Sequence, residues 1–163
     1  GEVRGPEAAT LLTAMNTGHD GSFGSLHANT AQETVTRMIN PPMNVPPIML
    51  TGLDLIIIQA RLHVNGKTAR KITEVAEIAG MEGSKPRLNT IWKYNASTDQ
   101  IEETGIPSNL REVICRAAGV TPDVFEKHVN QRQQIIEDLI ARDITDIQSV
   151  TTVIQNFYAQ SHH

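Results

Sequence analysis

One dipeptide constrains the fold of this 163-residue chain more than any other feature. Asn65-Gly66 is a pair that two-residue hairpin turns favour, because both turn positions need a positive φ. The run before it, residues 53–64, and the run after it, residues 68–79, are rich in branched apolar residues. The sequence therefore predicts an antiparallel hairpin built from these two runs.

Two helices and a short strand are expected before this hairpin. The first helix follows Pro6, and the second begins at Thr30, which forms a capping box with Glu33 three residues later. Between the two helices, residues 21–28 largely alternate small and apolar residues. This composition is typical of a short buried strand.

The pattern of apolar and turn-forming residues changes after residue 82. Glycines and a proline interrupt the strand pattern, and residues 88–94 and 100–103 predict a small second hairpin. Three helices are expected to follow, starting near Asn109, at Thr121, and at a second capping box of Thr145 with Gln148. Their predicted core stripes are Phe125, Val129, Ile136, Leu139 and Ile140 in one helix, and Ile147, Val150, Ile154 and Phe157 in the next.

Composition places the chain among folded, water-soluble domains. It has 39% hydrophobic residues, 20% charged residues and a net charge of -4, which argues against a free-standing nucleic-acid-binding protein. No apolar run approaches the ~20 residues that span a bilayer. The single cysteine, Cys115, is expected in a reduced cytosolic core.

The absence of an initiator methionine and the final His162-His163 suggest a cut chain whose residues 161–163 are a tag remnant.

Candidate chemical groups lie near the N-terminus. Glu2 follows an expected strand and precedes a helix, so it would point into the crevice where open sheets bind ligands, although a solvated surface glutamate fits the same pattern. His19 and His27 flank a glycine-rich turn and could donate hydrogen bonds to an oxyanion. They could instead bind a metal, but their spacing matches no common zinc pattern and no cysteine completes a ligand set.

A phosphate-binding loop is not present in the sequence. The tripeptide Gly66-Lys67-Thr68 matches the last three residues of such a loop. The loop also requires a glycine five positions before Gly66, and that position is Arg61. The tripeptide also lies between two predicted strands, whereas such a loop follows a strand and opens a helix. A hairpin turn with a solvated Lys67 is the better interpretation.

Three ordered segments nevertheless resemble those of a known family. They are residues 1–8 (Gly-Glu-Val-Arg-Gly-Pro-Glu-Ala), 15–22 and 26–29. They are similar to the Walker B and histidine boxes of the type II and type IV secretion ATPase superfamily, and within it to tight-adherence pilus and archaeal pilus or archaellum motors. Matching runs at 59–62, 72–75 and 80–83 extend the resemblance to about residue 83.

This resemblance implies a fold and a set of roles. Residues 1–82 would form the C-terminal half of an α/β, RecA-like P-loop ATPase core, and residues 83–160 an appendage of a small hairpin and three helices. Glu2 would orient or activate the attacking water and support the Mg2+ site, and His27 would contact the γ-phosphate. Nucleotide-site or interface support would come from Arg4, His19, Arg37 and Arg61, although His19 also suits a turn and both later arginines suit surface ion pairs.

The intact parent would then be a homohexamer that uses ATP and Mg2+ to drive protein secretion or filament assembly. It would lie at the cytoplasmic face of the membrane, contact a membrane platform protein through its last three helices, and bind no nucleic acid. Because the phosphate-binding loop is missing, this chain alone is expected neither to bind ATP tightly nor to hydrolyse it. Two alternatives stay open: a fragment of a RecA-like nucleic-acid motor, and a non-catalytic interaction module with vestigial boxes.

Overall fold

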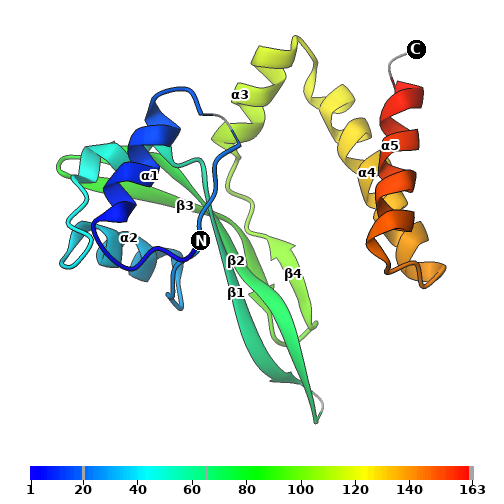
Figure 1. Ribbon diagram of the computed structural model, residues 1–163, viewed down its shortest axis with the longest axis horizontal. Helices are drawn as coiled ribbons and strands as arrows, with labels where there is room; N and C mark the ends of the chain where they lie inside the picture. The colour runs from blue at the N-terminus through cyan, green and yellow to red at the C-terminus, as the bar shows by residue number, and fades with distance from the viewer. Residues whose placement is uncertain (20, 65, 162–163) are drawn as a thin grey trace. The chain divides into compact units, whose positions relative to one another are not determined.

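A computed structural model describes residues 1–19, 21–64 and 66–161 of the chain. Asn65 of the predicted turn, Asp20, and the histidines of the expected tag lie outside the described residues. Residues 1–110 and 111–163 form two compact units (Figure 1). In chain order the elements are α1 (Glu7–Asn16), α2 (Ala31–Ile39), the 3-10 helix η1 (Pro47–Gly52), β1 (Leu55–Val64), β2 (Lys67–Glu82), β3 (Lys85–Asn95), β4 (Gln100–Glu103), α3 (Asn109–Ala118), α4 (Pro122–Ala141) and α5 (Ile147–Ser161).

The four strands form one antiparallel sheet in the order β1-β2-β3-β4. The predicted hairpin is confirmed: Val64 pairs with Lys67 across the turn, where Gly66 has a φ of 75°. The predicted second hairpin is also present as β3 and β4, but it continues the same sheet. Glu82 and Lys85 pair across a tight turn. The two compact units divide after residue 110, and β2 and β3 are hydrogen-bonded to each other within the first unit.

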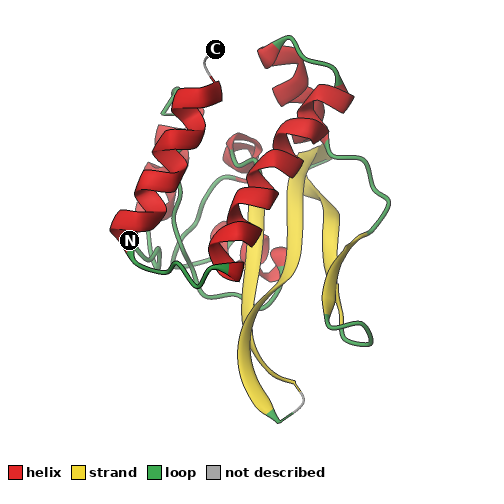
Figure 2. Cartoon of the chain, turned by 90° about the vertical axis from the view of Figure 1, so that its right-hand side faces the viewer, coloured by secondary structure: helices red, strands yellow, loops and turns green. Residues whose placement is uncertain are grey.

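The β1–β2 hairpin is longer than the rest of the sheet. β3 pairs with β2 only between Glu74 and Glu82, so residues 59–64 of β1 and 67–72 of β2 pair with each other alone. We call these residues the outer ribbon. It projects past the β3–β4 turn in both views (Figures 1 and 2).

The core of the first unit lies between the sheet and the helices that precede it. Leu12 of α1, Val35 of α2 and Leu50 of η1 are buried with Ala76 of β2. On β1 the side chains of Ile56 and Ile58 are buried, whereas Ile57 between them is 57% exposed. This alternation is that of a strand with one covered face, and α1, α2 and η1 supply the cover.

The segment 21–28 is not the buried strand that its composition predicts. Its only strand-like pairing within the described residues is an isolated parallel bridge between Glu2 and Ser25. Phe23 exposes 89% of its surface. A strand is stabilised by a ladder of backbone bonds, and one bridge holds only the centre of this segment, so the remainder is a loop.

Two glutamates of β2 hold the first turns of two helices. Glu74 Oε2 accepts a hydrogen bond from the Ala31 N–H at 2.8 Å, at the start of α2. Glu77, which is only 2% exposed, accepts bonds from the N–H of Asn109 at 2.8 Å and of Leu110 at 3.3 Å, at the start of α3. Residues three apart on a strand face opposite ways, so the two helix starts are fixed to opposite faces of β2.

The second unit comprises residues 111–163, most of α3 with α4 and α5. Thr121 caps α4 as predicted, accepting from the Val124 N–H at 3.4 Å. The cap of α5 was wrongly predicted: Asp146, not Thr145, accepts from the Ser149 N–H, at 2.9 Å. A carboxylate next to the helix start outcompetes the preceding hydroxyl because it also favours the positive end of the helix.

The predicted core stripes of α4 and α5 are too wide. Leu139 is buried, and Val150 and Phe157 are half-buried, but Ile136, Ile140 and Ile147 expose 58%, 73% and 81% of their surfaces. Two paired helices can cover only a narrow side of each other, which leaves these isoleucines outside. Cys115 is buried, as predicted. Among the described residues, no helix has the length and apolar character needed to cross a membrane.

Candidate functional site

The N-terminal segment and the loop before α2 meet through their backbones. The Val3 N–H donates to the Ser25 carbonyl at 2.7 Å, and the Ser25 N–H approaches the Gly1 carbonyl at 3.5 Å. This parallel bridge sets Glu2 beside the loop that carries His27. The two boxes of the sequence, separated by about twenty residues, are therefore neighbours in space.

The Glu2 carboxylate lies between two side chains that can carry positive charge. Its Oε1 is 3.0 Å from His27 Nε2, and its Oε2 is 2.6 Å from an Arg4 guanidinium nitrogen. The Glu2 side chain is 30% exposed and that of His27 is 84% exposed. His27 thus contacts the carboxylate while most of its ring remains open to a ligand.

Arg4 has the largest influence on the ionisation of Glu2. The hydrogen bond from Arg4 lowers the pKa of Glu2, and the charges of Arg4 and His27 lower it further. The same bond raises the pKa of Arg4. Glu2 is therefore an ionised carboxylate at neutral pH, which accepts hydrogen bonds but donates none.

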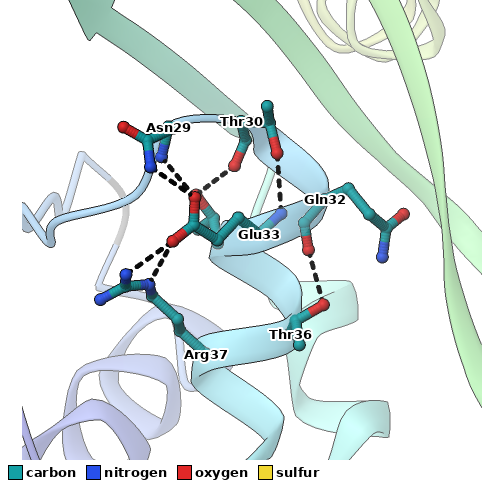
Figure 3. Close-up of polar contacts among 7 residues, drawn as sticks. Asn29, Thr30, Gln32, Glu33, Thr36 and Arg37 are labelled. Carbon is teal, nitrogen blue, oxygen red and sulfur yellow. Dashed lines mark hydrogen bonds and ion pairs between the residues drawn. The ribbon is translucent and has the colours of Figure 1, made fainter.

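The end of the His27 loop is anchored by α2 (Figure 3). Both the backbone N–H and the side-chain amide of Asn29 donate to Glu33 Oε2 at 2.9 Å. Arg37 holds the other oxygen of Glu33, with Nε at 2.7 Å. The Thr30 hydroxyl accepts from the Glu33 N–H at 3.0 Å, as the capping box predicts, but the returning bond of Glu33 goes to Asn29 rather than to Thr30.

Glu33 and Asn29 are site residues that sequence reasoning did not identify as such. Glu33 was expected only as part of a helix cap, although it stands six residues after His27 and fixes the backbone two residues after it. The backbone bond from Asn29 lowers the pKa of Glu33, as does the side-chain bond from Arg37. The signal that could have found them is the capping box itself, because a box placed directly after a candidate residue also fixes the approach of that residue.

The remaining predicted residues lie in other surroundings. His19 is exposed beyond α1; its carbonyl accepts from the Ser22 hydroxyl at 2.7 Å, and its Nδ1 is 3.5 Å from the Thr17 hydroxyl. Arg37 forms the i,i+4 ion pair with Glu33 on α2. Arg61 lies on the outer ribbon. The cluster therefore joins Glu2, Arg4 and His27, and Arg37 reaches it only through the Glu33–Asn29 contacts.

A cavity of about 330 Å3 lies beside the Glu2–Ser25 bridge. It is lined by Val3, Ser25 and Leu26 together with residues of α1, α2 and β1, and none of the lining residues carries a charged side chain. The lining therefore offers no cation to a phosphate. The charged groups of this region lie in the exposed Glu2 cluster.

The cluster suits phosphoryl oxygens better than a directly bound metal. Within the described residues, no three His, Cys, Asp or Glu side chains are grouped as a metal site requires. Arg4 already neutralises one oxygen of Glu2. His27 and Arg4 are donors that match anionic oxygens, and the ionised Glu2 is an acceptor that matches a water molecule.

Comparison with known proteins decides the family. Residues 1–156 match the family described as Type II/IV secretion system protein. The chain belongs to this family. The resemblance carried by the three sequence boxes is thereby confirmed. The family match also continues through β3, β4 and the three C-terminal helices, well beyond the point near residue 83 where the resemblance was expected to stop.

Several known proteins are similar to parts of the chain. An uncharacterised protein of Methanocaldococcus jannaschii is 37% identical over 136 residues, which are 82% of this chain and 19% of that protein. A putative conjugal transfer protein of Mycobacterium tuberculosis is 35% identical over 96 residues, 56% of this chain and 27% of that protein. The probable conjugal transfer protein TrbB of Sinorhizobium fredii is 31% identical over 110 residues, 63% of this chain and 30% of that protein. The chain thus spans less than a third of each of these relatives.

Proposed function

We propose that this chain carries the water-orienting and phosphate-sensing part of a RecA-like ATPase domain, in a motor for protein secretion or for assembly of a pilus or archaellum. The observation that supports it is the contact between Glu2 and His27 at 3.0 Å. These are the two residues to which the family resemblance assigns catalysis. Their side chains come from separate segments and contact each other.

Each residue of the cluster would have a distinct task. Glu2 accepts a hydrogen bond from the attacking water and orients it, while Arg4 fixes the second carboxylate oxygen. His27 Nε2, which contacts Glu2 in this structure, would turn to donate to a phosphoryl oxygen when nucleotide is bound, since its ring is largely exposed. ATP with Mg2+ supplies the phosphoryl group and neutralises its charge. Catalysis of this reaction is mostly positioning and electrostatic stabilisation, which these three side chains can provide.

The chain alone would not turn over ATP. Its only Gly-Lys-Thr sequence contains the hairpin turn between β1 and β2, with Gly66 at a φ of 75° and Lys67 exposed. A phosphate-binding loop instead connects a strand to a helix. In the intact protein another segment would have to hold the phosphates.

The surroundings of the motor follow from the same proposal. The intact protein would be a homohexamer at the cytoplasmic face of the membrane, and it would act without binding nucleic acid. Ile136, Ile140 and Ile147 of the second unit offer exposed apolar surface for a membrane platform protein. Because two relatives are named conjugal transfer proteins, export by a conjugation-type machine is a variant of the same function.

A non-catalytic interaction module is a second candidate. It is favoured by the same three exposed isoleucines, since apolar side chains gathered on one helical unit are typical of a binding surface. In that case the Glu2 cluster would serve only to fold the N-terminal segment. The two candidates differ in whether the cluster affects nucleotide turnover.

ATP hydrolysis by the intact protein separates them. We expect Glu2→Gln and His27→Ala each to lower kcat by about 10²-fold or more, with nucleotide binding retained. Glu102→Gln on β4 is a matched control, because its carboxylate also accepts side-chain bonds, from Thr98 and Asn95, but outside the cluster. Normal turnover by both cluster variants would remove the ATPase roles and leave the interaction module.

A further inference from the structure

The outer ribbon contains a pairing that sheets ordinarily avoid. Arg61 on β1 lies directly opposite Arg70 on β2. In an antiparallel pair such residues project from the same face, and like charges there destabilise the sheet. Both arginines are exposed. The ribbon therefore keeps two cationic groups side by side where folding alone would favour a different pair.

The whole ribbon is positively charged in an otherwise acidic chain. Residues 59–72 contain four of the 14 Lys and Arg residues and none of the 18 Asp and Glu residues. The rest of the chain keeps ten basic and 18 acidic residues, which is a net charge of -8. Positive charge is thus concentrated on the part of the sheet that projects furthest from its neighbours (Figures 1 and 2).

Ion pairs between described residues do not involve the two arginines. Lys71 of the ribbon pairs with Asp99 at 2.7 Å. In the part of the chain that the structure describes, neither Arg61 nor Arg70 forms an ion pair. His63 and Thr68 lie on the same face and contact each other at 3.4 Å, which adds polar groups next to the arginines. This face is suited to carboxylates, which form planar, bidentate hydrogen bonds with guanidinium groups.

The charge of the remainder of the chain discriminates among anionic partners. A long polyanion such as DNA or an anionic membrane would meet the ribbon together with a body of net charge -8, which repels it. A second copy of the chain instead brings 18 acidic residues against ten basic ones outside its own ribbon, a charge opposite to that of the ribbon. We propose that the outer ribbon, through Arg61 and Arg70, docks on an acidic surface of a second copy of this chain.

Such a contact is head-to-tail, because the ribbon of one copy meets a different surface of the next. Contacts of this kind form rings when their rotation closes. The inference deepens the proposed function by naming the surface that joins the copies of the motor, and only the ring rests on that function. The docking itself requires neither nucleotide nor the Glu2 cluster.

Sedimentation velocity of the full chain tests the docking. We expect concentration-dependent association at low salt that weakens at high salt, because exposed ion pairs are screened. Arg61→Glu with Arg70→Glu should weaken association at least tenfold. Arg116→Glu with Lys127→Glu, two exposed basic residues of the helical unit, makes the same charge change and should leave association intact. Equal loss in both double variants, or none in the ribbon variant, overturns the proposal.

A single substitution separates docking from folding. Arg61→Glu places a carboxylate opposite Arg70 and replaces a repulsive pair with an attractive one. We expect the thermal midpoint to rise while association weakens. A lower midpoint with unchanged association would show that the arginine pair serves the fold, and would overturn the proposal.

The other anionic partners are outcomes of the same series. Phosphatidylserine vesicles and a DNA duplex are offered to the chain and to the ribbon double variant. Binding that depends on Arg61 and Arg70, in a chain that does not associate with itself, overturns docking on a second copy. Since none of these measurements uses ATP, failure of the docking is distinguishable from failure of the ATPase proposal.

Discussion

The buried carboxylate of Glu77 accepts a hydrogen bond from the backbone N–H of Asn109 at 2.8 Å. Leu110 N–H and the Ser108 hydroxyl donate to the same carboxylate. An unpaired N–H at the first turn of a helix usually finds a nearby side chain of its own loop. Here the acceptor stands 32 residues earlier, on the central part of β2.

Removal of this acceptor should destabilise the first unit. We expect Glu77→Ala to lower the free energy of unfolding by about 2 kcal/mol or more, since it leaves several buried donors without a partner. Urea denaturation measures the change. Glu82→Ala, an exposed position at the end of the same strand, should stay within about 0.5 kcal/mol. Equal losses in the two variants would contradict the role of Glu77.

The Arg4–Glu2 bond should appear in an acid titration. Because the folded pKa of Glu2 is lowered, the bond adds stability above the unfolded pKa of about 4.3, and that stability is lost as the pH falls through the folded pKa. We expect the NMR titration midpoint of the Glu2 carboxyl carbon to rise in Arg4→Ala. His27→Ala should raise it less, because the Arg4 hydrogen bond is the largest cause of the shift.

Glu33 should control the order of the His27 loop. In Glu33→Gln an NH2 group replaces one of the two acceptor oxygens. The single oxygen that remains cannot accept from both Asn29 donors and from Arg37. We expect the Asn29 amide hydrogen to exchange several-fold faster and the imidazole signals of His27 to broaden. Glu102→Gln removes a comparable acceptor on β4, and it should change neither signal. Unchanged Asn29 exchange in Glu33→Gln would refute the anchoring.

The turn between β3 and β4 offers a test on a tyrosine. The Tyr94 hydroxyl donates to Asp99 Oδ1 at 2.7 Å, and this bond raises the pKa of Tyr94 above its usual value. We expect Asp99→Asn to bring the Tyr94 pKa down, because the amide carries no charge that opposes the phenolate. Spectrophotometric titration in a Tyr158→Phe background isolates Tyr94, since the chain has two tyrosines. A Tyr94 pKa that does not fall in Asp99→Asn would show that Asp99 is not the cause.

Local signals in the sequence predicted most helices and strands. The Asn65-Gly66 turn and the Thr30 and Thr121 caps each act over a few residues, and the hairpin and helices that they predict are present. The predictions that failed depend on contacts between residues far apart in the sequence. Residues 21–28 have the composition of a strand but only one backbone bridge, and Ile136 and Ile140 continue a helical stripe past the width that α5 can cover.

The candidate site was predictable in its residues but not in its support. Family resemblance named Glu2, Arg4 and His27, and the structure brings these three together. The anchoring of Asn29 by Glu33 and the tie between Ala31 and Glu74 depend on tertiary approach, which no spacing along the chain encodes. The opposed Arg61 and Arg70 likewise became visible only from strand register.

The spacing of Glu74 and Glu77 has a practical meaning for redesign of this chain. Each carboxylate holds a helix start on its own face of β2, so an insertion or deletion of one residue between them would turn one of the two the wrong way and free its helix. The outer ribbon carries no such tie to a helix. Residues can therefore be removed from the ribbon in cross-strand pairs while both anchors keep their register, provided that the docking residues Arg61 and Arg70 are retained.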